Sequence, residues 1–198
     1  MGGASDIKSW ISGRLDPLAA TDAGRHWHPD GSLVDAAVLV PIVEREDGLS
    51  VILTRRAGSL RDHTGEVALP GGRRDPGETP GETALREAEE EIGLDRSFVS
   101  LAGLSTTYVT PSFRYHLVTV VGFVRPGFTL SPNPHEVAHV FEAPFGFLMD
   151  PSNYEVREGV TPLGDVRRFY ALAHGDELIF GVTAGILRKL YERLYGAA

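Results

Sequence analysis

Residues 72–94 constrain the fold of this chain more than any other segment. Thr79 and Glu82 are spaced as the two ends of a capping box, and Pro80 occupies the first helical position. Gly93 stands where a helix takes a left-handed C-cap. The segment therefore predicts a loop up to Thr79 and a short helix after it. The apolar stripe of this helix is expected at Leu85, Ala88 and Ile92.

Three carboxylates share one face of the predicted helix. Glu87, Glu90 and Glu91 stand at positions i, i+3 and i+4, so their side chains project together. Like charges at this spacing destabilise a bare helix by about a few tenths of a kcal/mol per pair. A divalent cation would offset the repulsion, and carboxylate oxygens suit Mg²⁺ or Mn²⁺. The alternative is a solvated charged face that holds no ligand.

The residues around these carboxylates resemble the Nudix box, G-x5-E-x7-R-E-U-x-E-E-x-G-U, where U is a bulky aliphatic residue. Gly72 and Glu78 take the first two fixed positions, and the run from Arg86 to Leu94 takes the others. Every fixed polar and glycine position is matched, while Ala88 is smaller than the usual aliphatic residue. The resemblance implies an α/β (α+β) fold, namely the Nudix α/β/α sandwich with a mixed β-sheet.

The same resemblance implies a metal site built on the helix. Glu87, Glu90 and Glu91 would hold Mg²⁺ or Mn²⁺, with Glu136 as a fourth carboxylate and the Gly71 carbonyl as a further ligand. Glu90 is interpreted as the metal-bridging residue. The general base stays open among Glu87, Glu90 and Glu136.

Arg86 lies one helical turn from both Glu82 and Glu90, so we expect it to orient a carboxylate of the catalytic group. The alternative is an ordinary surface ion pair, worth about 0.3–0.5 kcal/mol. Glu78 precedes the helix and is expected to support the ligands without touching the metal. Glu142 is a second, weaker candidate for the fourth carboxylate of the metal site, after Glu136.

The segment just upstream resembles the signature of the coenzyme A pyrophosphatase branch of Nudix enzymes, L-L-T-x-R-[SA]-x3-R-x3-G-x3-F-P-G-G. Residues 52–72 match it, with Ile and Leu as conservative replacements at positions 52 and 69. Arg56 and Arg61 are then candidate phosphate ligands, because guanidinium groups pair bidentately with phosphate. Each could instead pack or pair with a surface acid. Gly65 would allow a close backbone approach.

An aromatic residue near the central strands is the candidate for stacking on adenine. Phe113 is the first choice and Tyr108 the second, because both flank the segment between two predicted strands. An aromatic residue beside a strand also fits the core, and that alternative stays open.

Together the two resemblances imply a metal-dependent enzyme that hydrolyses the pyrophosphate bond of coenzyme A or its thioesters. The products would be 4′-phosphopantetheine, or its acyl form, and adenosine 3′,5′-bisphosphate. ADP-ribose or another nucleoside diphosphate derivative is the alternative substrate. The non-enzymatic alternative is a domain that senses a nucleotide or coenzyme A. Such a domain is expected to lose carboxylates of the box, whereas this chain keeps them all.

The composition of the chain disfavours several classes of binding partner. The formal net charge of −8 disfavours nucleic acid, so a small anionic substrate needs metal and a local basic patch. Arg55, Arg56, Arg61, Arg73 and Arg74 supply such a patch. The absence of cysteine excludes disulfides and thiolate ligands. No stretch approaches the ~18 apolar residues of a membrane span, so we expect no membrane partner and a cytoplasmic location. Oligomeric state, acyl-chain preference and the number of metals stay open.

One Nudix domain is expected over residues 1–198, with residues 1–32 as a helix and loop extension. The order of predicted elements favours layers on both sides of a mixed sheet over regular strand–helix alternation. The predicted strands are 34–43, 50–55, 66–69, 98–107, 114–125, 136–142, 153–158 and 166–173. The predicted helices are 5–15, the capped helix after Thr79, 144–149 and 179–195.

Overall fold

The computed structural model describes residues 4–18, 27, 32–58, 65–110, 114–160 and 166–196. Its helices are α1 (Ala4–Ser12), α2 (Pro80–Ile92), α3 (Phe145–Leu148) and α4 (Gly181–Tyr195), with short 3₁₀ turns at Arg96–Phe98 and Pro151–Asn153. Its strands are β1 (Val34–Arg45), β2 (Gly48–Arg56), β3 (Val67–Ala68), β4 (Gly71–Arg73), β5 (Val99–Val109), β6 (Tyr115–Val124), β7 (Val137–Pro144), β8 (Glu155–Val160), β9 (Val166–His174) and β10 (Glu177–Phe180).

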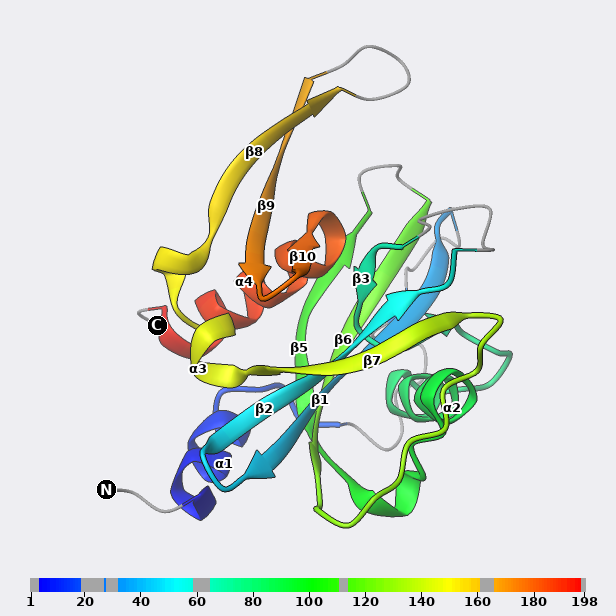
Figure 1. Ribbon diagram of the computed structural model, residues 1–198. Helices are drawn as coiled ribbons and strands as arrows, with labels where there is room; N and C mark the ends of the chain where they lie inside the picture. The colour runs from blue at the N-terminus through cyan, green and yellow to red at the C-terminus, as the bar shows by residue number, and fades with distance from the viewer. Residues whose placement is uncertain are drawn as a thin grey trace.

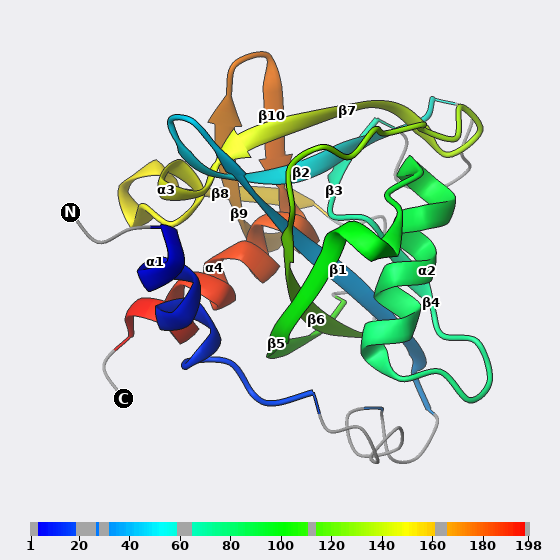
Figure 2. The same ribbon diagram turned by 90° about the horizontal axis from the view of Figure 1, so that it is seen from below.

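The central sheet is mixed, with strand order β3-β2-β1-β6-β5, while β4 also pairs with β1 and β7 with β2. Strands β1 and β6 are parallel, and the other pairs are antiparallel. Helix α2 covers one face of this sheet and α4 the other, as Figure 2 shows. The predicted α/β/α sandwich with a mixed β-sheet is confirmed.

Strand β1 divides the core because alternate residues face opposite sides of the sheet. Val38, Val40 and Ile42 belong to the cluster that packs against α4. Ala37 and Leu39 belong to the cluster that packs against α2. Both faces of β1 are therefore buried, as its continuous apolar run requires.

The N-terminal segment packs onto the rest of the molecule. Ile11 of α1 is fully buried in the same cluster as the apolar side chains of α4. Asp16 forms an isolated bridge with Leu104 of β5, and the two backbones exchange hydrogen bonds of 2.9 Å. The helix of the predicted extension is thus part of the core on the α4 side.

Three elements differ from the sequence-based prediction, because strand β10 was missed as well as β4, and the last helix starts later than predicted. The short strand β4 was missed because the glycines at positions 71 and 72 read as loop. The last helix begins at Gly181, since residues 179 and 180 end strand β10, which pairs with β9. The apolar stripe of α2 also shifts: Ala84, Ala88 and Ile92 are buried, and Leu85 is only half-buried.

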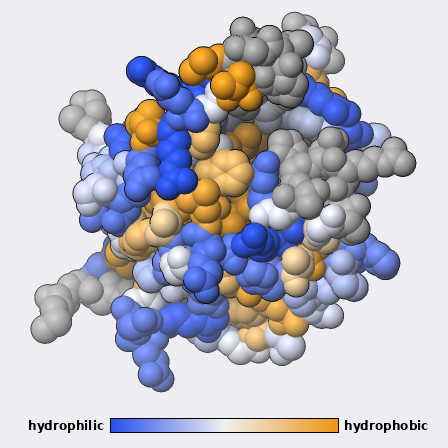
Figure 3. Space-filling model, turned by 45° about the horizontal axis from the view of Figure 1, so that its top comes forward, coloured by the Kyte–Doolittle hydropathy of each residue, from blue (hydrophilic) through white to orange (hydrophobic). Residues whose placement is uncertain are grey.

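A second sheet, with strand order β10-β9-β8, carries a long hairpin that extends from the body of the molecule in Figure 1. Its apolar side chains Val156, Val160 and Val166 are exposed, with relative accessibilities of 61%, 71% and 65%. Figure 3 shows hydrophobic surface gathered on this side of the molecule, with hydrophilic side chains around it.

Replacing Gly93 with alanine is expected to destabilise the protein more than replacing Gly175. Both glycines have left-handed φ values, 65° and 57°, so each variant incurs a cost of about 1–2 kcal/mol. A Cβ at position 93 would also lie 2.9 Å from the Ser131 nitrogen, whereas one at 175 meets nothing within 4 Å. Urea unfolding of both variants measures the difference. Equal losses of unfolding free energy would contradict a role for the Ser131 contact.

Candidate functional site

The start of α2 is held by the predicted capping box. The Thr79 backbone N–H donates to Glu82 Oε2 at 2.8 Å, and the Glu82 N–H donates to the Thr79 hydroxyl at 3.3 Å. Gly93 caps the other end with a left-handed backbone. Pro80 and Ile92 therefore bound the helix, and its carboxylates face β4 in a fixed register.

Strand β4 lies so close to α2 that position 72 admits no side chain. A Cβ at Gly72 would collide with the carboxylate of Glu87. A Cβ at Gly71 would collide with the backbone of β1, at the Ala37 carbonyl. The double glycine thus allows the loop, the sheet and the acidic helix to meet.

Arg86 joins the loop to the helix. Its Nε donates to Glu78 Oε1 at 2.8 Å, and its Nη1 donates to Glu87 Oε1 at 2.9 Å and to Glu90 Oε2 at 3.1 Å. Its Nη2 donates to the Arg73 carbonyl at 2.8 Å. The expected contact with Glu90 is present. The expected contact with Glu82 is wrong, because that carboxylate caps the helix and Glu78 takes its place.

Glu78 is the most acidic carboxyl group of this network. Hydrogen bonds from Arg86 lower its pKa to about 2, and those from the Asp75 N–H and the Thr83 hydroxyl add to the effect. The side chain therefore stays ionised and holds Arg86 in place. Its expected role in supporting the metal ligands stays a prediction.

Glu91 is the buried carboxylate of the group, with a relative accessibility of 5%. Its Oε2 accepts a hydrogen bond of 3.1 Å from the Gly71 N–H, and its Oε1 lies 3.9 Å from Arg56 Nη1. Burial raises the pKa of Glu91 to about 7, and the charges of Glu87 and Glu136 act in the same direction. A nearby cation would favour its ionised form.

Glu87 and Glu90 differ in exposure although they are one turn apart. The Glu87 side chain is mostly buried, and this burial raises its pKa, assisted by the charges of Glu90 and Glu136. The Glu90 side chain is 57% exposed. One face of α2 thus presents a buried, a partly buried and an exposed carboxylate, counting Glu91 as the first.

Glu136 approaches the helix from the loop before β7. Asn133 Nδ2 donates to Glu136 Oε1 at 3.0 Å, and the Glu136 carbonyl accepts from the Ala57 N–H at 2.8 Å. Its charge raises the pKa of both Glu87 and Glu91. Sequence reasoning missed Asn133, whose signal is an Asx-type turn just before a strand. The second candidate, Glu142, is paired with Arg45 instead.

Within the residues that the structure describes, no three acidic or histidine side chains are placed closely enough to hold a metal ion. Arg86 holds Glu87 and Glu90 in this arrangement. The donor set still suits a hard divalent cation, because it consists of carboxylates, whose oxygens such a cation prefers, and because the charge of Glu136 raises the pKa of both Glu87 and Glu91. The ligand roles of Glu87, Glu90, Glu91, Glu136 and Gly71 stay predictions.

Two of the predicted substrate-binding residues can be placed. Arg56 lies on β2 beside Glu91, and its Nε is buried without a hydrogen-bond partner in the described part of the chain. Gly65 has a left-handed φ of 68° and lies near Arg55. Arg61 and Phe113 fall outside the described residues. Tyr108 packs on Gly185 of α4, which agrees with the core alternative.

The family follows from comparison with known proteins. Residues 33–166 match the family model described as NUDIX domain. The chain belongs to the Nudix family. A protein named Nudix hydrolase NudL, described as uncharacterized, from Photorhabdus laumondii subsp. laumondii is 36% identical over 179 residues, which cover 90% of this chain and 89% of the relative. A protein of the same name from Yersinia pestis (strain Pestoides F) is 38% identical over 164 residues, covering 80% and 79%.

Solved structures agree with this Nudix fold. A MutT/nudix family protein from Enterococcus faecalis has a TM-score of 0.53 at 17% identity, covering 98% of this chain and 75% of that one. DR0079 from Deinococcus radiodurans has a TM-score of 0.52 at 18% identity, covering 88% and 90%. The chain is thus a Nudix hydrolase, a pyrophosphohydrolase of a class that generally uses divalent metal ions. The described helices include none long and apolar enough to cross a membrane.

Glu78→Gln is expected to flatten the pH dependence of stability in acid. Folding lowers the pKa of Glu78 from 4.5 to about 2, so its contribution is present above pH 4.5 and is lost as the pH falls toward 2. Urea unfolding between about pH 6 and about pH 3 measures this slope. Glu89→Gln is the control, because Glu89 is an exposed residue of the same helix that pairs with Arg96. A slope in Glu78→Gln as steep as in the wild type would contradict the prediction.

Proposed function

We propose that this Nudix hydrolase cleaves the pyrophosphate bond of coenzyme A or its thioesters, with Mg²⁺ or Mn²⁺ as its metal. The products are 4′-phosphopantetheine, or its acyl form, and adenosine 3′,5′-bisphosphate. The proposal rests on the coenzyme A-type signature over residues 52–72 and on where its first arginine lies.

That arginine, Arg56, carries the proposal. Its Nη1 lies 3.9 Å from the Glu91 carboxylate, and its buried Nε has no hydrogen-bond partner in the described part of the structure. A buried donor without a partner costs about 1–3 kcal/mol. A substrate phosphate would supply the missing acceptor beside the acidic cluster. The same donor would offset charge that the metal leaves uncompensated.

The carboxylates are proposed to have two roles in the reaction, metal binding and general-base catalysis. Glu87, Glu90, Glu91 and Glu136, with the Gly71 carbonyl, would hold the metal, which supplies neutralisation of the diphosphate and acidification of a bound water. One of Glu87, Glu90 and Glu136 accepts the proton of the attacking water as general base. Arg86 orients two of these carboxylates, and Glu78 holds Arg86.

We also propose that residues 1–198 form a single domain, with residues 1–32 as an extension of it. Ile11 is buried with the side chains of α4, so the first helix shares the core of the Nudix fold. The proposed partner is a small-molecule substrate rather than a nucleic acid, because the net charge of −8 disfavours binding to a polyanion.

A substrate panel tests the proposed function directly. The purified protein is incubated with coenzyme A, acetyl-coenzyme A, ADP-ribose and NADH, each with Mg²⁺ or Mn²⁺, and the products are identified by mass. We expect the highest kcat/KM for coenzyme A or its thioester. A higher kcat/KM for ADP-ribose would move the protein to the other substrate class. Turnover that survives exhaustive chelation would contradict the metal site.

Glu90→Gln is expected to lower kcat by about 100-fold or more, because it removes a charged metal ligand. The melting temperature should change little, since the side chain is 57% exposed. Glu89→Gln is the matched control on the same helix, because Glu89 pairs with Arg96 rather than with Arg86. Wild-type turnover by Glu90→Gln would remove this residue from the metal site.

A further inference from the structure

Two arginines contact one tyrosine ring at the end of the central sheet where β4 ends and β6 begins. Arg73 Nη2 donates to the Tyr115 hydroxyl at 3.0 Å, and its guanidinium carbon lies 5.6 Å from the ring centroid. The guanidinium carbon of Arg114 lies 5.4 Å from the same centroid. We name this group the Arg73–Tyr115–Arg114 cluster.

The cluster carries cationic charge that no carboxylate in the described part of the chain neutralises. Most other arginines near the site are used structurally: Arg55 pairs with Glu177, Arg74 donates to the Glu78 carbonyl, and Arg86 holds the acidic cluster. The protein has 27 acidic and 19 basic residues. The guanidinium groups of Arg73 and Arg114 are both exposed, and neither pairs with a carboxylate among the described residues, so both are available to an anion.

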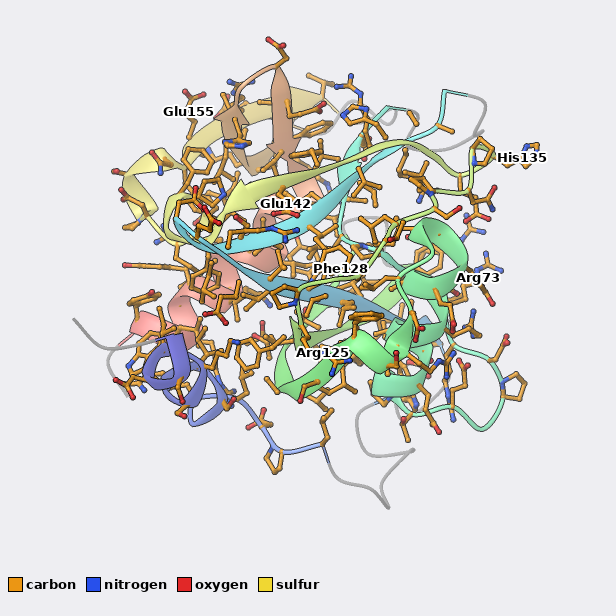
Figure 4. The ribbon with its side chains drawn as sticks, turned by 60° about the horizontal axis from the view of Figure 1, so that its bottom comes forward. Arg73, Arg125, Phe128, His135, Glu142 and Glu155 are labelled. Atoms are coloured by element: carbon orange, nitrogen blue, oxygen red, sulfur yellow. The ribbon has the colours of Figure 1, made fainter. Side chains whose placement is uncertain are left out.

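The position of the cluster is tied to the acidic site. Arg73 directly follows Gly72, and a Cβ at Gly72 would collide with the Glu87 carboxylate. The Arg73 carbonyl accepts a hydrogen bond of 2.8 Å from Arg86 Nη2. Arg73 is therefore the residue next to the glycine that the Glu87 carboxylate contacts. Figure 4 shows Arg73 beside α2.

The sheet lets Arg73 reach across to Tyr115. Arg73 of β4 is aligned with Ala36 of β1, and Tyr115 of β6 is aligned with Val34 of the same strand. The Arg73 side chain therefore crosses β1, and the small Ala36 leaves room for it. Gly72 faces α2, so the next residue turns to the opposite face. The metal-binding carboxylates and the cationic cluster thus flank the same short strand.

We propose that Arg73 and Arg114 bind a second phosphate of the substrate, the 3′-phosphate on the ribose of coenzyme A. This inference rests on the proposed function. The 3′-phosphate stands on the same sugar that bears the 5′-diphosphate, and Arg73 directly follows the residue of β4 that the Glu87 carboxylate contacts, on the other face of the sheet. Two guanidinium groups offer several donors to its oxygens, and Tyr115 positions one of them.

The cluster would then set specificity within the nucleotide class. ADP-ribose and 3′-dephospho-coenzyme A lack this phosphate, so their binding gains nothing from Arg73 and Arg114. A substrate without the 3′-phosphate loses the interaction with the two arginines. The diphosphate is present in all of these substrates, so its binding does not distinguish them.

The experiment compares kcat/KM for coenzyme A and for 3′-dephospho-coenzyme A in the wild type, Arg73→Ala, Arg114→Ala and Tyr115→Phe. Loss of a charge-assisted phosphate contact should lower kcat/KM for coenzyme A by about 10- to 150-fold in each arginine variant. The value for 3′-dephospho-coenzyme A should stay the same. Tyr115→Phe keeps the ring but not the hydroxyl, so a smaller loss confined to coenzyme A is expected.

Arg125→Ala is the matched control. Arg125 also lies on an aromatic ring, with its guanidinium carbon 5.1 Å from the Phe98 centroid, and has no carboxylate partner in the described residues. Figure 4 labels it on the other side of α2 from Arg73. Its removal should leave the ratio of the two kcat/KM values unchanged. Melting temperatures of all variants separate lost binding from lost folding.

Calorimetry supplies a readout that does not need turnover. Adenosine 3′,5′-bisphosphate should bind the wild type more tightly than AMP does, and Arg73→Ala should remove the difference. If the wild type cleaves both coenzyme A forms but the arginine variants affect them alike, the 3′-phosphate site is wrong while the proposed function stands. If the wild type cleaves neither form, the proposed function fails and the 3′-phosphate site falls with it.

Discussion

The site depends on one guanidinium group. Arg86 donates to Glu78, Glu87 and Glu90 and to a carbonyl of β4, so it ties the loop, the helix and the sheet together. Its side chain is 19% exposed and that of Glu78 is 17% exposed, so this pair is more shielded than an ordinary surface pair worth about 0–1 kcal/mol. Breaking a buried pair costs about 3–5 kcal/mol. The carboxylates can crowd together because this cation stands among them.

Strand alternation separates two adjacent arginines into different roles. Arg55 faces the second sheet, where Glu177 accepts its hydrogen bond at 2.8 Å and also lies 2.8 Å from His139. Arg56 faces α2 and approaches Glu91. One residue therefore joins the two sheets, while its neighbour enters the acidic cluster. This division follows from the two-residue period of a strand.

Because the protein is acidic, the arginines around the carboxylate cluster are important for binding an anion. Burial and mutual repulsion raise the pKa of Glu87 and that of Glu91. Such a cluster repels an anionic substrate unless cations intervene. Arg56, Arg73 and Arg114 stand around it on two faces of the sheet. We propose that the placement of these three side chains decides which anion the protein binds.

The sequence by itself determined the capped helix and its three carboxylates, because caps and spacing are local properties of the chain. The mixed sandwich followed from the resemblance of its motif to the Nudix box. It did not reveal β4 or β10, since glycine-rich and short strands are defined by their partners. Tertiary structure alone decided that Arg86 binds Glu78 instead of Glu82, and that Arg56 approaches Glu91. These contacts join residues from different elements, and only the packing of the sheet against α2 brings them together.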